Sequence, residues 1–528
     1  MNQWEELQQA ASNGRVSRRE FMRRAAALGV ATSLASGVLA KAGYAQTPVK
    51  GGNLRVGIAG GSTTDSMDIT TYTDTTMINV STSVWDSLVE VDDKNQIQPE
   101  LLESLEPSDN AQEWVCNVRK GINFSNGKTL DADDIIYSLN LHRGEGSKSG
   151  AAGPMKPITD IVKMDTHQIK IVLDAPDADL PYVLSDYHLL VVPKDFTDWA
   201  NPIGTGGYKL EVFEPGVRAI LTNRGEYWKE GRCNLESAEL SVINDDAARM
   251  QALLAGEVDV THRVVVPLVD QINAAGNFEL VQAAAGYHFN LPMLCDTPPY
   301  NNNDVRLALK YAMNRRKLAE MMFGAFGRPG NDHPIPESDP FHNSELPQRE
   351  YDPERAAFHA KKAGLGVSDV ILQASDAAFN GALDMAVLYQ ATAAAAGINV
   401  TVRREPADGF WDNVWLKAPF MTSYWGGRPA ATQMLAVAYS SSAPWNDTHW
   451  RVDSFDKLLA DAKATTDQAK RKDYIWEMQR MLHEEGGALI PLFKDWLDVH
   501  DTKVKGHIPH GMFDLCNGRI VQKAWIEA

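Results

Sequence analysis

Alternation of hydrophobic and polar residues predicts strands along most of the chain. Leu54, Val56 and Ile58 alternate with more polar positions, so residues 53–58 are expected to form a strand with one buried face. The same pattern, bounded by Gly, Pro, Asn or Asp, recurs between later helical segments. Further strands are predicted over residues 114–118, 168–173, 208–213, 218–222, 258–260, 397–402 and 489–493.

A repeat of three to four residues predicts helices between these strands. Val305, Leu309 and Ala312 fall on one stripe, which indicates a single long helix over residues 304–323. Carboxylates that begin at Asp131 suit a helix start, since they satisfy free N–H groups and oppose the positive end of the helix dipole. Other helices are predicted over residues 131–143, 246–254, 453–465 and 467–484, and from residue 352 onward. Strands that alternate with helices predict an α/β fold with mixed sheets.

The first 45 residues have the pattern of an export signal. Residues 15–24 are basic, residues 25–40 form a weakly apolar run, and Gly43 and Ala45 are small residues suited to cleavage. Within the basic part, residues 17–22 resemble the twin-arginine motif, which directs folded proteins across a bacterial inner membrane. Cleavage is therefore expected near Ala45.

This signal predicts a periplasmic protein that uses the twin-arginine export machinery. The apolar run has 16 residues, fewer than the roughly 20 that a spanning helix needs, and no Cys follows it. A lipid anchor is therefore not expected. The alternative interpretation is a basic, Ala-rich N-terminal helix of a cytoplasmic protein.

Size and charge restrict the remaining 483 residues. A chain of this length is expected to form two or three domains. The formal charge is −18 for all 528 residues, and loss of the basic leader would leave −21. An acidic surface disfavours nucleic acid and anionic lipid as partners. A single small-molecule pocket can still have a local field of the opposite sign.

The sequence offers no metal or catalytic signature. Its four cysteines, Cys116, Cys233, Cys295 and Cys516, lack a Cys-x-x-Cys pair, so zinc and thioredoxin-type sites are not expected. Disulfide bridges and isolated buried thiols both remain open. The histidines show no metal-ligand spacing, and there is no nucleophile elbow, phosphate loop or dinucleotide fingerprint. We therefore expect neither enzymatic activity, nor a cofactor, nor a metal site.

Several short motifs, in a fixed order, indicate a known family. Residues 202–210 are similar to its "P-x-GTGPY-x-L" turn, and residues 351–356, YDPERA, to its "YDPEKA" motif. The other matching segments are residues 85–89 with 99–101, 119–128 with 133–135, 223–228, and 305–315. Taken together, the chain resembles the family 5 extracellular solute-binding proteins of ABC importers, which include dipeptide-, oligopeptide- and nickel-binding proteins.

The resemblance implies a two-lobed periplasmic-binding-protein fold of cluster C type, with mixed sheets, a hinge and an inserted domain. Hinge motion would close the lobes on a ligand. The implied parts are a signal peptide, residues 1–45; lobe I, residues 46–88, 200–286 and 491–528; an inserted domain II, residues 89–199; and lobe III, residues 287–490. The hinge would lie near residues 286 and 490.

The resemblance also implies a ligand site on two loops. One loop follows the first strand and includes Thr64 and Asp65. The other, in lobe III, contains Trp425, Gly426 and Gly427. Trp425 would stack on the ligand or wall it off, and the glycines would let backbone groups approach it.

Arg428 departs from the family's peptide-binding pattern. Peptide binders place an Asp shortly after the Trp, where it pairs with the ligand's ammonium group, whereas here Arg428 follows the two glycines. A guanidinium suits carboxylate, sulfate or phosphate. We therefore expect a ligand with an anionic group and poor binding of ordinary dipeptides. A surface ion pair at Arg428 is the alternative.

Asn290 and Trp445 complete the candidate site, each with an alternative. Asn290 could reach the cleft or form a structural hydrogen bond. Trp445 could line the pocket or pack in the core. The nearby Trp411, Trp415 and Trp450 are expected in the core.

The function that the resemblance implies is solute capture for import. The chain would act as a monomer, bind a peptide or other small polar solute, and deliver it to an inner-membrane ABC permease. A periplasmic enzyme or folding helper on the same scaffold is the alternative. Presentation of the ligand to a chemoreceptor is compatible with solute capture. The sequence does not name the ligand.

Overall fold

The computed structural model describes residues 48–364 and 370–527. Its backbone contacts separate residues 1–50 from a second compact unit, residues 51–528, and the fold below is that of the second unit. The predicted signal peptide lies outside the described residues.

A mixed seven-stranded sheet contains the first strand of the chain. Its strand order is β12-β19-β11-β1-β10-β9-β8, with β1 parallel to β10 and β11 and the other pairs antiparallel. The strands are β1 (Asn53–Ile58), β8 (Tyr208–Glu214), β9 (Arg218–Asn223), β10 (Ser237–Val242), β11 (Val260–His262), β12 (Phe278–Ala283) and β19 (Trp496–Asp501). The helices of this region are α4 (Thr75–Val84), α8 (Asp246–Leu254), α9 (Val269–Ala275), α18 (Asp514–Gly518) and α19 (Ile520–Lys523).

A smaller antiparallel sheet, in the order β4-β5-β7-β6, is formed by one continuous stretch of chain. Its strands are β4 (Leu102–Pro107), β5 (Glu113–Val118), β6 (Ile158–Asp165) and β7 (Gln168–Leu173). Near it lie α5 (Ala132–Asn140), α6 (Ala152–Met155), α7 (Leu180–Val183), and the hairpin of β2 (Val89–Val91) and β3 (Ile97–Pro99). As predicted, Asp131 begins α5, and its side chain accepts hydrogen bonds from two backbone N–H groups of the first turn.

A third sheet, β14-β18-β13-β17, carries the candidate site. Its strands are β13 (His288–Pro292), β14 (Gly327–Pro329), β17 (Ser423–Trp425) and β18 (Ala488–Lys494). A separate parallel pair consists of β15 (Val370–Ala374) and β16 (Val400–Arg404). The helices are α10 (Asn303–Tyr311), α11 (Arg315–Phe323), α12 (Pro353–Lys362), α13 (Ala382–Ala394), α14 (Phe410–Asn413), α15 (Ala431–Tyr439), α16 (Asp453–Lys463) and α17 (Gln468–Glu485).

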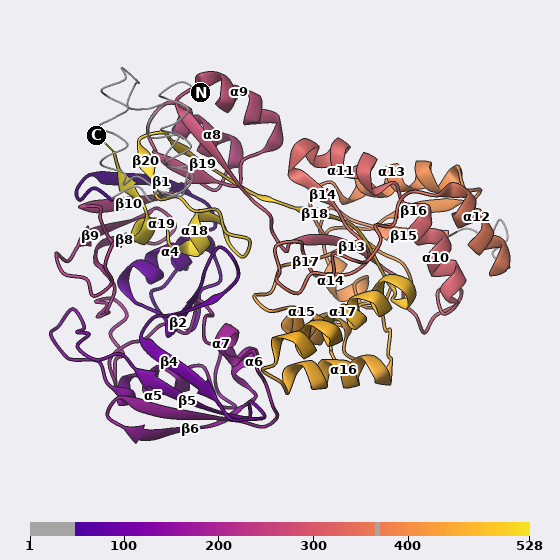
Figure 1. Cartoon of the computed structure of the whole chain (residues 1–528). Coiled ribbons are helices and arrows are strands. Elements are labelled where there is room, and N and C mark those ends of the chain that lie inside the picture. The colour runs from indigo at the N-terminus through magenta and orange to yellow at the C-terminus, as the bar shows by residue number, and fades with distance from the viewer. Residues whose placement is uncertain (1–47, 365–369, 528) are drawn as a thin grey trace, which may run out of the picture. The chain divides into compact units, whose positions relative to one another are not determined.

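The chain passes twice between the first and third sheets. Figure 1 shows these passages, from β12 to β13 and back from β18 to β19. Only Asp495 separates the two strands of the return passage. The chain then ends in the antiparallel pair β20 (Val504–Lys505) and β21 (Trp525–Ile526). Two lobes of mixed helix and sheet joined in this way confirm the predicted fold class.

The prediction of one helix over residues 304–323 is wrong. The structure has two helices there, α10 and α11, separated by residues 312–314. The side chain of Asn314 accepts a hydrogen bond from the Lys317 N–H and so begins a new helix. Asn competes with the helical backbone for hydrogen bonds, which explains the break inside a continuous apolar stripe. Strands β11 and β16 each begin two or three residues later than predicted.

The four cysteines are free thiols in the structure. Cys116, Cys233 and Cys516 are buried, and Cys295 is partly buried. Burial raises the pKa of the Cys116 and Cys516 thiols to about 12, so both are protonated at neutral pH. Of the two alternatives that the sequence left open, the structure has isolated thiols.

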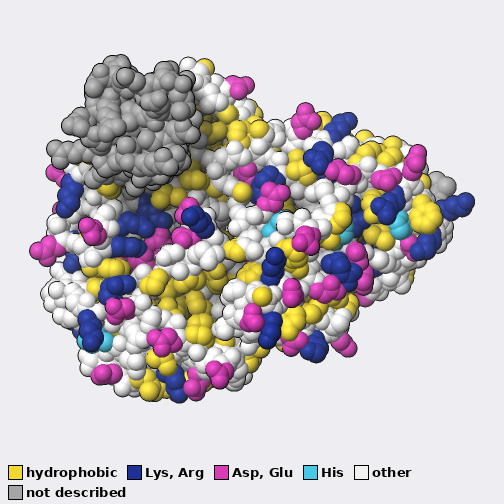
Figure 2. All heavy atoms as spheres, viewed as in Figure 1, with side chains coloured by type: hydrophobic (Ala, Val, Ile, Leu, Met, Phe, Trp, Pro, Cys, Tyr) yellow, Lys and Arg dark blue, Asp and Glu magenta, His cyan; other side chains and the backbone are white. Residues whose placement is uncertain are grey.

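Charged side chains are mixed on the visible face of the molecule. Figure 2 shows Asp and Glu scattered among Lys and Arg over this face, so the negative net charge does not gather there into one acidic patch. No helix in the part of the chain that the structure describes is long and apolar enough to cross a membrane.

Candidate functional site

Strand pairing brings two predicted site residues to one place. β17 runs antiparallel to β13, with His288 opposite Trp425 and Asn290 opposite Ser423. Side chains on one face of neighbouring strands lie within reach of each other. Asn290 and Trp425 therefore meet although 134 positions separate them in the sequence.

Their meeting point is Asp447, a residue that the sequence analysis missed. The Trp425 Nε1–H donates to Asp447 Oδ2 at 3.2 Å, and the Asn290 Nδ2–H lies 3.4 Å from the same oxygen. Trp415 Nε1 lies 3.5 Å from it. Asp447 is fully buried. Asn290 is also fully buried, so the geometry supports the structural hydrogen bond among the two alternatives for that residue.

Burial has the largest effect on the pKa of Asp447. It raises the pKa of this carboxyl to about 7, although the donors on Trp425, Trp415 and Asn290 oppose the shift. In the sequence, Asp447 lies between Trp445 and Trp450, and no periodic pattern or motif distinguishes it from the chain's other carboxylates.

Aromatic rings cover the side of this cluster that is open to solvent. The Trp445 ring lies 6.2 Å from the Trp425 ring and 6.3 Å from the Trp415 ring. Trp411 lies 5.6 Å from Trp415 and 5.7 Å from Tyr424, edge-on to both. Trp445, Trp411 and Tyr424 are 47%, 39% and 38% exposed, whereas Trp425 is buried. The expectation of a core position is wrong for Trp411, and it is confirmed for Trp450.

The two glycines after Trp425 differ in their surroundings. A Cβ added to Gly427 would lie 3.1 Å from the Cα of Gly286, where the chain enters β13. The nearest atom to a Cβ at Gly426 would be Arg428 Nη1, at 3.7 Å. Only Gly427 is therefore required for close approach of two backbone segments.

Arg428 is half-buried and has no carboxylate partner within residues 48–364 and 370–527. Its Nη1 donates to the carbonyls of Gly426 and Gly427 at 3.2 and 3.1 Å. Burial lowers the pKa of this guanidinium, and the charges of Asp186 and Tyr187 partly oppose the shift. Among the described residues, the surface ion pair that was the alternative does not form.

The loop after β1 is separate from this cluster. Thr64 is exposed, and Asp65 accepts a hydrogen bond from the Ser62 N–H at 2.8 Å. Burial raises the pKa of the Asp65 carboxyl. Within the described residues, no hydrogen bond or ion pair joins Thr64 or Asp65 to residues 424–428. The structure thus brings together the lobe III residues and leaves this pair on the first sheet.

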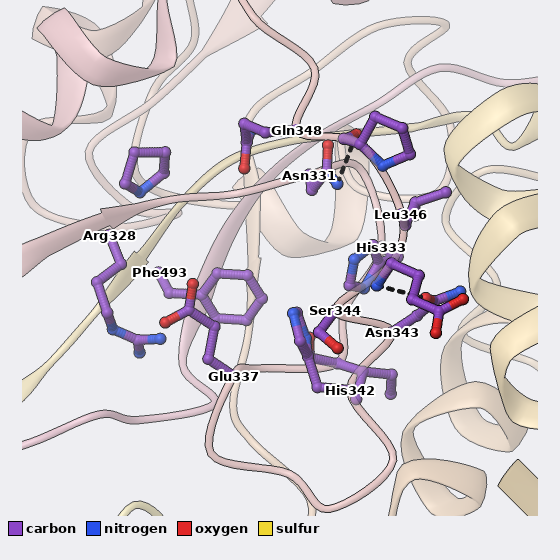
Figure 3. Close-up of a pocket in the computed structure, with 14 residues that line it drawn as sticks. Arg328, Asn331, His333, Glu337, His342, Asn343, Ser344, Leu346, Gln348 and Phe493 are labelled. Carbon is purple, nitrogen blue, oxygen red and sulfur yellow. Dashed lines mark hydrogen bonds between the residues drawn. The ribbon is translucent and has the colours of Figure 1, made fainter.

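A cavity of about 530 Å³ lies beside the candidate site and contains none of the eight predicted residues. Figure 3 shows residues from β14, from the following loop and from β18 around it, with His333 and His342 close together. Pro336, in that loop, lies 3.5 Å from the position of a Cβ on Gly286, which connects this wall to the Gly427 contact. Among the described residues, no group of three or more His, Cys, Asp or Glu could hold a metal ion.

Comparison with known proteins identifies the family. Residues 96–447 match the family described as "Bacterial extracellular solute-binding proteins, family 5 Middle". This chain belongs to that family. It is the solute-binding subunit of an ABC importer.

Relatives and solved structures agree with this assignment. The chain is 23% identical to the di/tripeptide-binding protein 1 of Pseudomonas aeruginosa, over 74% of this chain and 79% of that protein. It is 23% identical to the dipeptide-binding protein of Escherichia coli, over 78% and 84%. The structure of HbpA2 from Haemophilus parasuis matches with a TM-score of 0.81 at 19% identity, covering 90% of this chain and all of that one.

Proposed function

We propose that this chain binds a peptide-like or other small polar solute between lobe I and lobe III and delivers it to an inner-membrane permease. Peptide-binding relatives support the class of ligand. The lobe boundaries that we propose are residues 46–88, 200–286 and 491–528 for lobe I and 287–490 for lobe III, with domain II at 89–199. The chain acts as a monomer and without catalysis.

The proposed ligand carries an anionic group that Arg428 binds. The observation that carries this proposal is a half-buried guanidinium whose Nη1, among the residues that the structure describes, is held only by the carbonyls of Gly426 and Gly427. A positive charge taken from water without a carboxylate partner favours an anion beside it. The Asp that would pair with a peptide ammonium after the Trp is absent from residues 426–428.

The exposed aromatic rings are proposed as the wall of the ligand site. Trp445, Trp411 and Tyr424 present ring surface to solvent, and Trp425 supports them from behind through its bond to Asp447. Aromatic faces bind apolar or ring-shaped parts of a ligand. Thr64 and Asp65 are proposed to meet the ligand from lobe I, in the closed state.

Export through the twin-arginine machinery is part of the proposal. The motif at residues 17–22 and the weak apolar run after it support cleavage near Ala45 and a periplasmic location. The family's extracellular character agrees with this location.

A thermal-shift screen of residues 46–528 tests the proposed function. A ligand that binds only the folded state adds about 2.7 kcal/mol to stability at a hundredfold excess over its Kd. We expect a hit among anionic amino-acid conjugates or opines. For that hit, Arg428→Ala should weaken binding at least tenfold, and Arg316→Ala, at an exposed ion pair elsewhere in lobe III, should not. A hit confined to free dipeptides, with unchanged binding by the Arg428 variant, would contradict the anionic ligand.

A further inference from the structure

The cavity beside the candidate site contains a buried histidine without a partner. His333 is 1% exposed and lines the cavity, and neither of its ring nitrogens has a hydrogen-bond partner within the described residues. Buried polar groups are nearly always hydrogen-bonded, so an orphaned ring at a cavity wall indicates a missing partner in the cavity. Burial and the neighbouring His342 lower the pKa of His333 to about 3, which leaves the ring neutral with one acceptor nitrogen.

The free polar atoms around this histidine are mainly acceptors. His342 Nδ1 lies 3.0 Å from the Ile335 carbonyl, which can only accept, so Nδ1 carries a proton. Glu337 and Glu345 are exposed at the rim, and neither has an ion pair among the residues described. Arg328 is the one Lys or Arg among the described residues that line the cavity, and it already binds Asp495 at 2.6 Å.

Hydrogen bonds within the protein hold the walls of the cavity in place before any ligand binds. Asn331 Nδ2 donates to the Pro347 carbonyl at 3.2 Å, and Gln348 Nε2 donates to the Gly330 carbonyl at 2.8 Å, which closes the loop on itself. The Asn343 N–H donates to Gln479 of α17 at 2.9 Å, which ties the loop to a long helix. A pre-organised pocket of this size is typical of small-molecule sites.

We propose that this cavity is a second binding site, which takes the primary ammonium group of a small organic ligand. The ammonium donates to His333 and His342 while Glu337 and Glu345 balance its charge. A proton donor with a positive charge fits a pocket that contains the neutral imidazole of His333 and unpaired carboxylates better than an anion does. The volume of about 530 Å³ leaves room for the chain that carries the ammonium.

The site is separate from the proposed function. None of the residues proposed to bind the anionic ligand lines the cavity. A negative result here leaves the Arg428 proposal intact, and loss of the Arg428 proposal leaves this site intact, because the two use different probes and variants.

Titration with 1,4-diaminobutane, 1,4-butanediol and succinate tests the proposal. These probes share a four-carbon chain and differ in charge. Isothermal titration calorimetry gives the affinity, and histidine ring signals in NMR report the location. We expect 1,4-diaminobutane to bind and shift the His333 signals, and the other two probes not to bind.

Variants separate this site from non-specific attraction. Glu337→Gln removes an exposed carboxylate and should weaken diamine binding at least threefold, whereas Glu320→Gln, exposed on α11 outside the cavity, should leave it unchanged. His333→Phe should abolish binding. Equal binding of butanediol, or unchanged diamine affinity in the Glu337 variant, or absence of any shift at His333 would overturn the proposal.

Discussion

Asp447 is a buried carboxyl group without a cation beside it. In the described part of the chain its partners are Trp425, Trp415 and Asn290, which donate hydrogen bonds but carry no charge. Burial raises its pKa to about 7. The folded state therefore binds a proton that the unfolded chain releases near pH 4. This favours folding most at low pH, and the advantage is lost as the pH rises to about 7.

Asp447→Asn should make stability less dependent on pH. The neutral amide replaces the protonated carboxyl and cannot lose a proton. The free energy of unfolding of the wild type should therefore fall by roughly 2 to 3 kcal/mol between pH 5 and 8, and that of the variant should not show this fall. Urea unfolding of both proteins at the two pH values measures this difference. Burial also raises the pKa of Asp339 to about 7. Asp339 is present in both proteins, so its contribution cancels when their free energies of unfolding are compared. If the two proteins differ in free energy of unfolding by the same amount at pH 5 and at pH 8, Asp447 does not titrate in this range, which would contradict the raised pKa.

Asp332 is the opposite case, a buried carboxylate with two cations. It lies 2.6 Å from Arg315 and 2.8 Å from Arg349, and all three side chains are at most 2% exposed. The charges of these two arginines and of Lys310 hold the pKa of Asp332 well below its usual range. The ion triad ties the loop after β14 to the start of α11.

Asp332→Asn should cost about 3 to 5 kcal/mol, because it leaves two buried guanidinium groups unpaired. Asn is the appropriate replacement, since residue 332 has φ of 59°, which Asn tolerates. Urea unfolding at pH 7 gives the cost. As a control, Glu350→Gln breaks the Arg316 pair, which is 66% and 56% exposed, and should change stability by less than about 1 kcal/mol. Similar costs for the two variants would show that the triad is not the cause.

At the scale of elements, Gly427 fixes how β17 leaves the third sheet. Gly427→Ala would place a Cβ 3.1 Å from the Gly286 Cα, a backbone atom that cannot turn aside. We expect a cost of about 1 to 3 kcal/mol, typical of overpacking. Gly426→Ala is the matched control, since its nearest atom is the flexible end of Arg428 at 3.7 Å, and its cost should stay near 0.5 kcal/mol. Melting temperatures of the two variants measure their costs in stability. Equal decreases in melting temperature would argue against the Gly427–Gly286 contact as the cause.

The sequence predicts elements better than it predicts the contacts between them. Alternation and capping are local, so β1 and the start of α5 appear where the pattern places them. Asn314 broke a predicted helix because its side chain competes with the backbone, which a hydrophobic stripe does not report. The motif predicts Trp425 as a site residue, but the contact of Trp425 with Asp447 depends on strand pairing and on a loop 22 residues later. His333 lies in an irregular loop without any periodic signal.

At the scale of the molecule, the segment that we assign to domain II contacts the helices that follow the Trp425 loop. Asp179, beside α7, lies 2.5 Å from Arg471 of α17, with side chains 1% and 4% exposed, and also bonds Thr432 of α15. Asn95 Nδ2 donates to the Pro429 carbonyl at 2.9 Å, next to Arg428. Arg428, the proposed anion-binding residue, is thus the direct sequence neighbour of Pro429, which accepts a hydrogen bond from domain II.

Asp179→Asn should loosen this contact. The amide keeps an acceptor for Thr432 but leaves the buried Arg471 charge unpaired, which is strongly destabilising. We expect amide hydrogen exchange to become at least tenfold faster in α7 and α15, while β1, in the core of the first sheet, keeps its protection. The matched control is Asp177→Asn, because its partner Lys463 is 30% exposed and can be hydrated. Unchanged exchange in both helices, or equal acceleration by the control, would show that the Asp179–Arg471 pair does not hold these segments together.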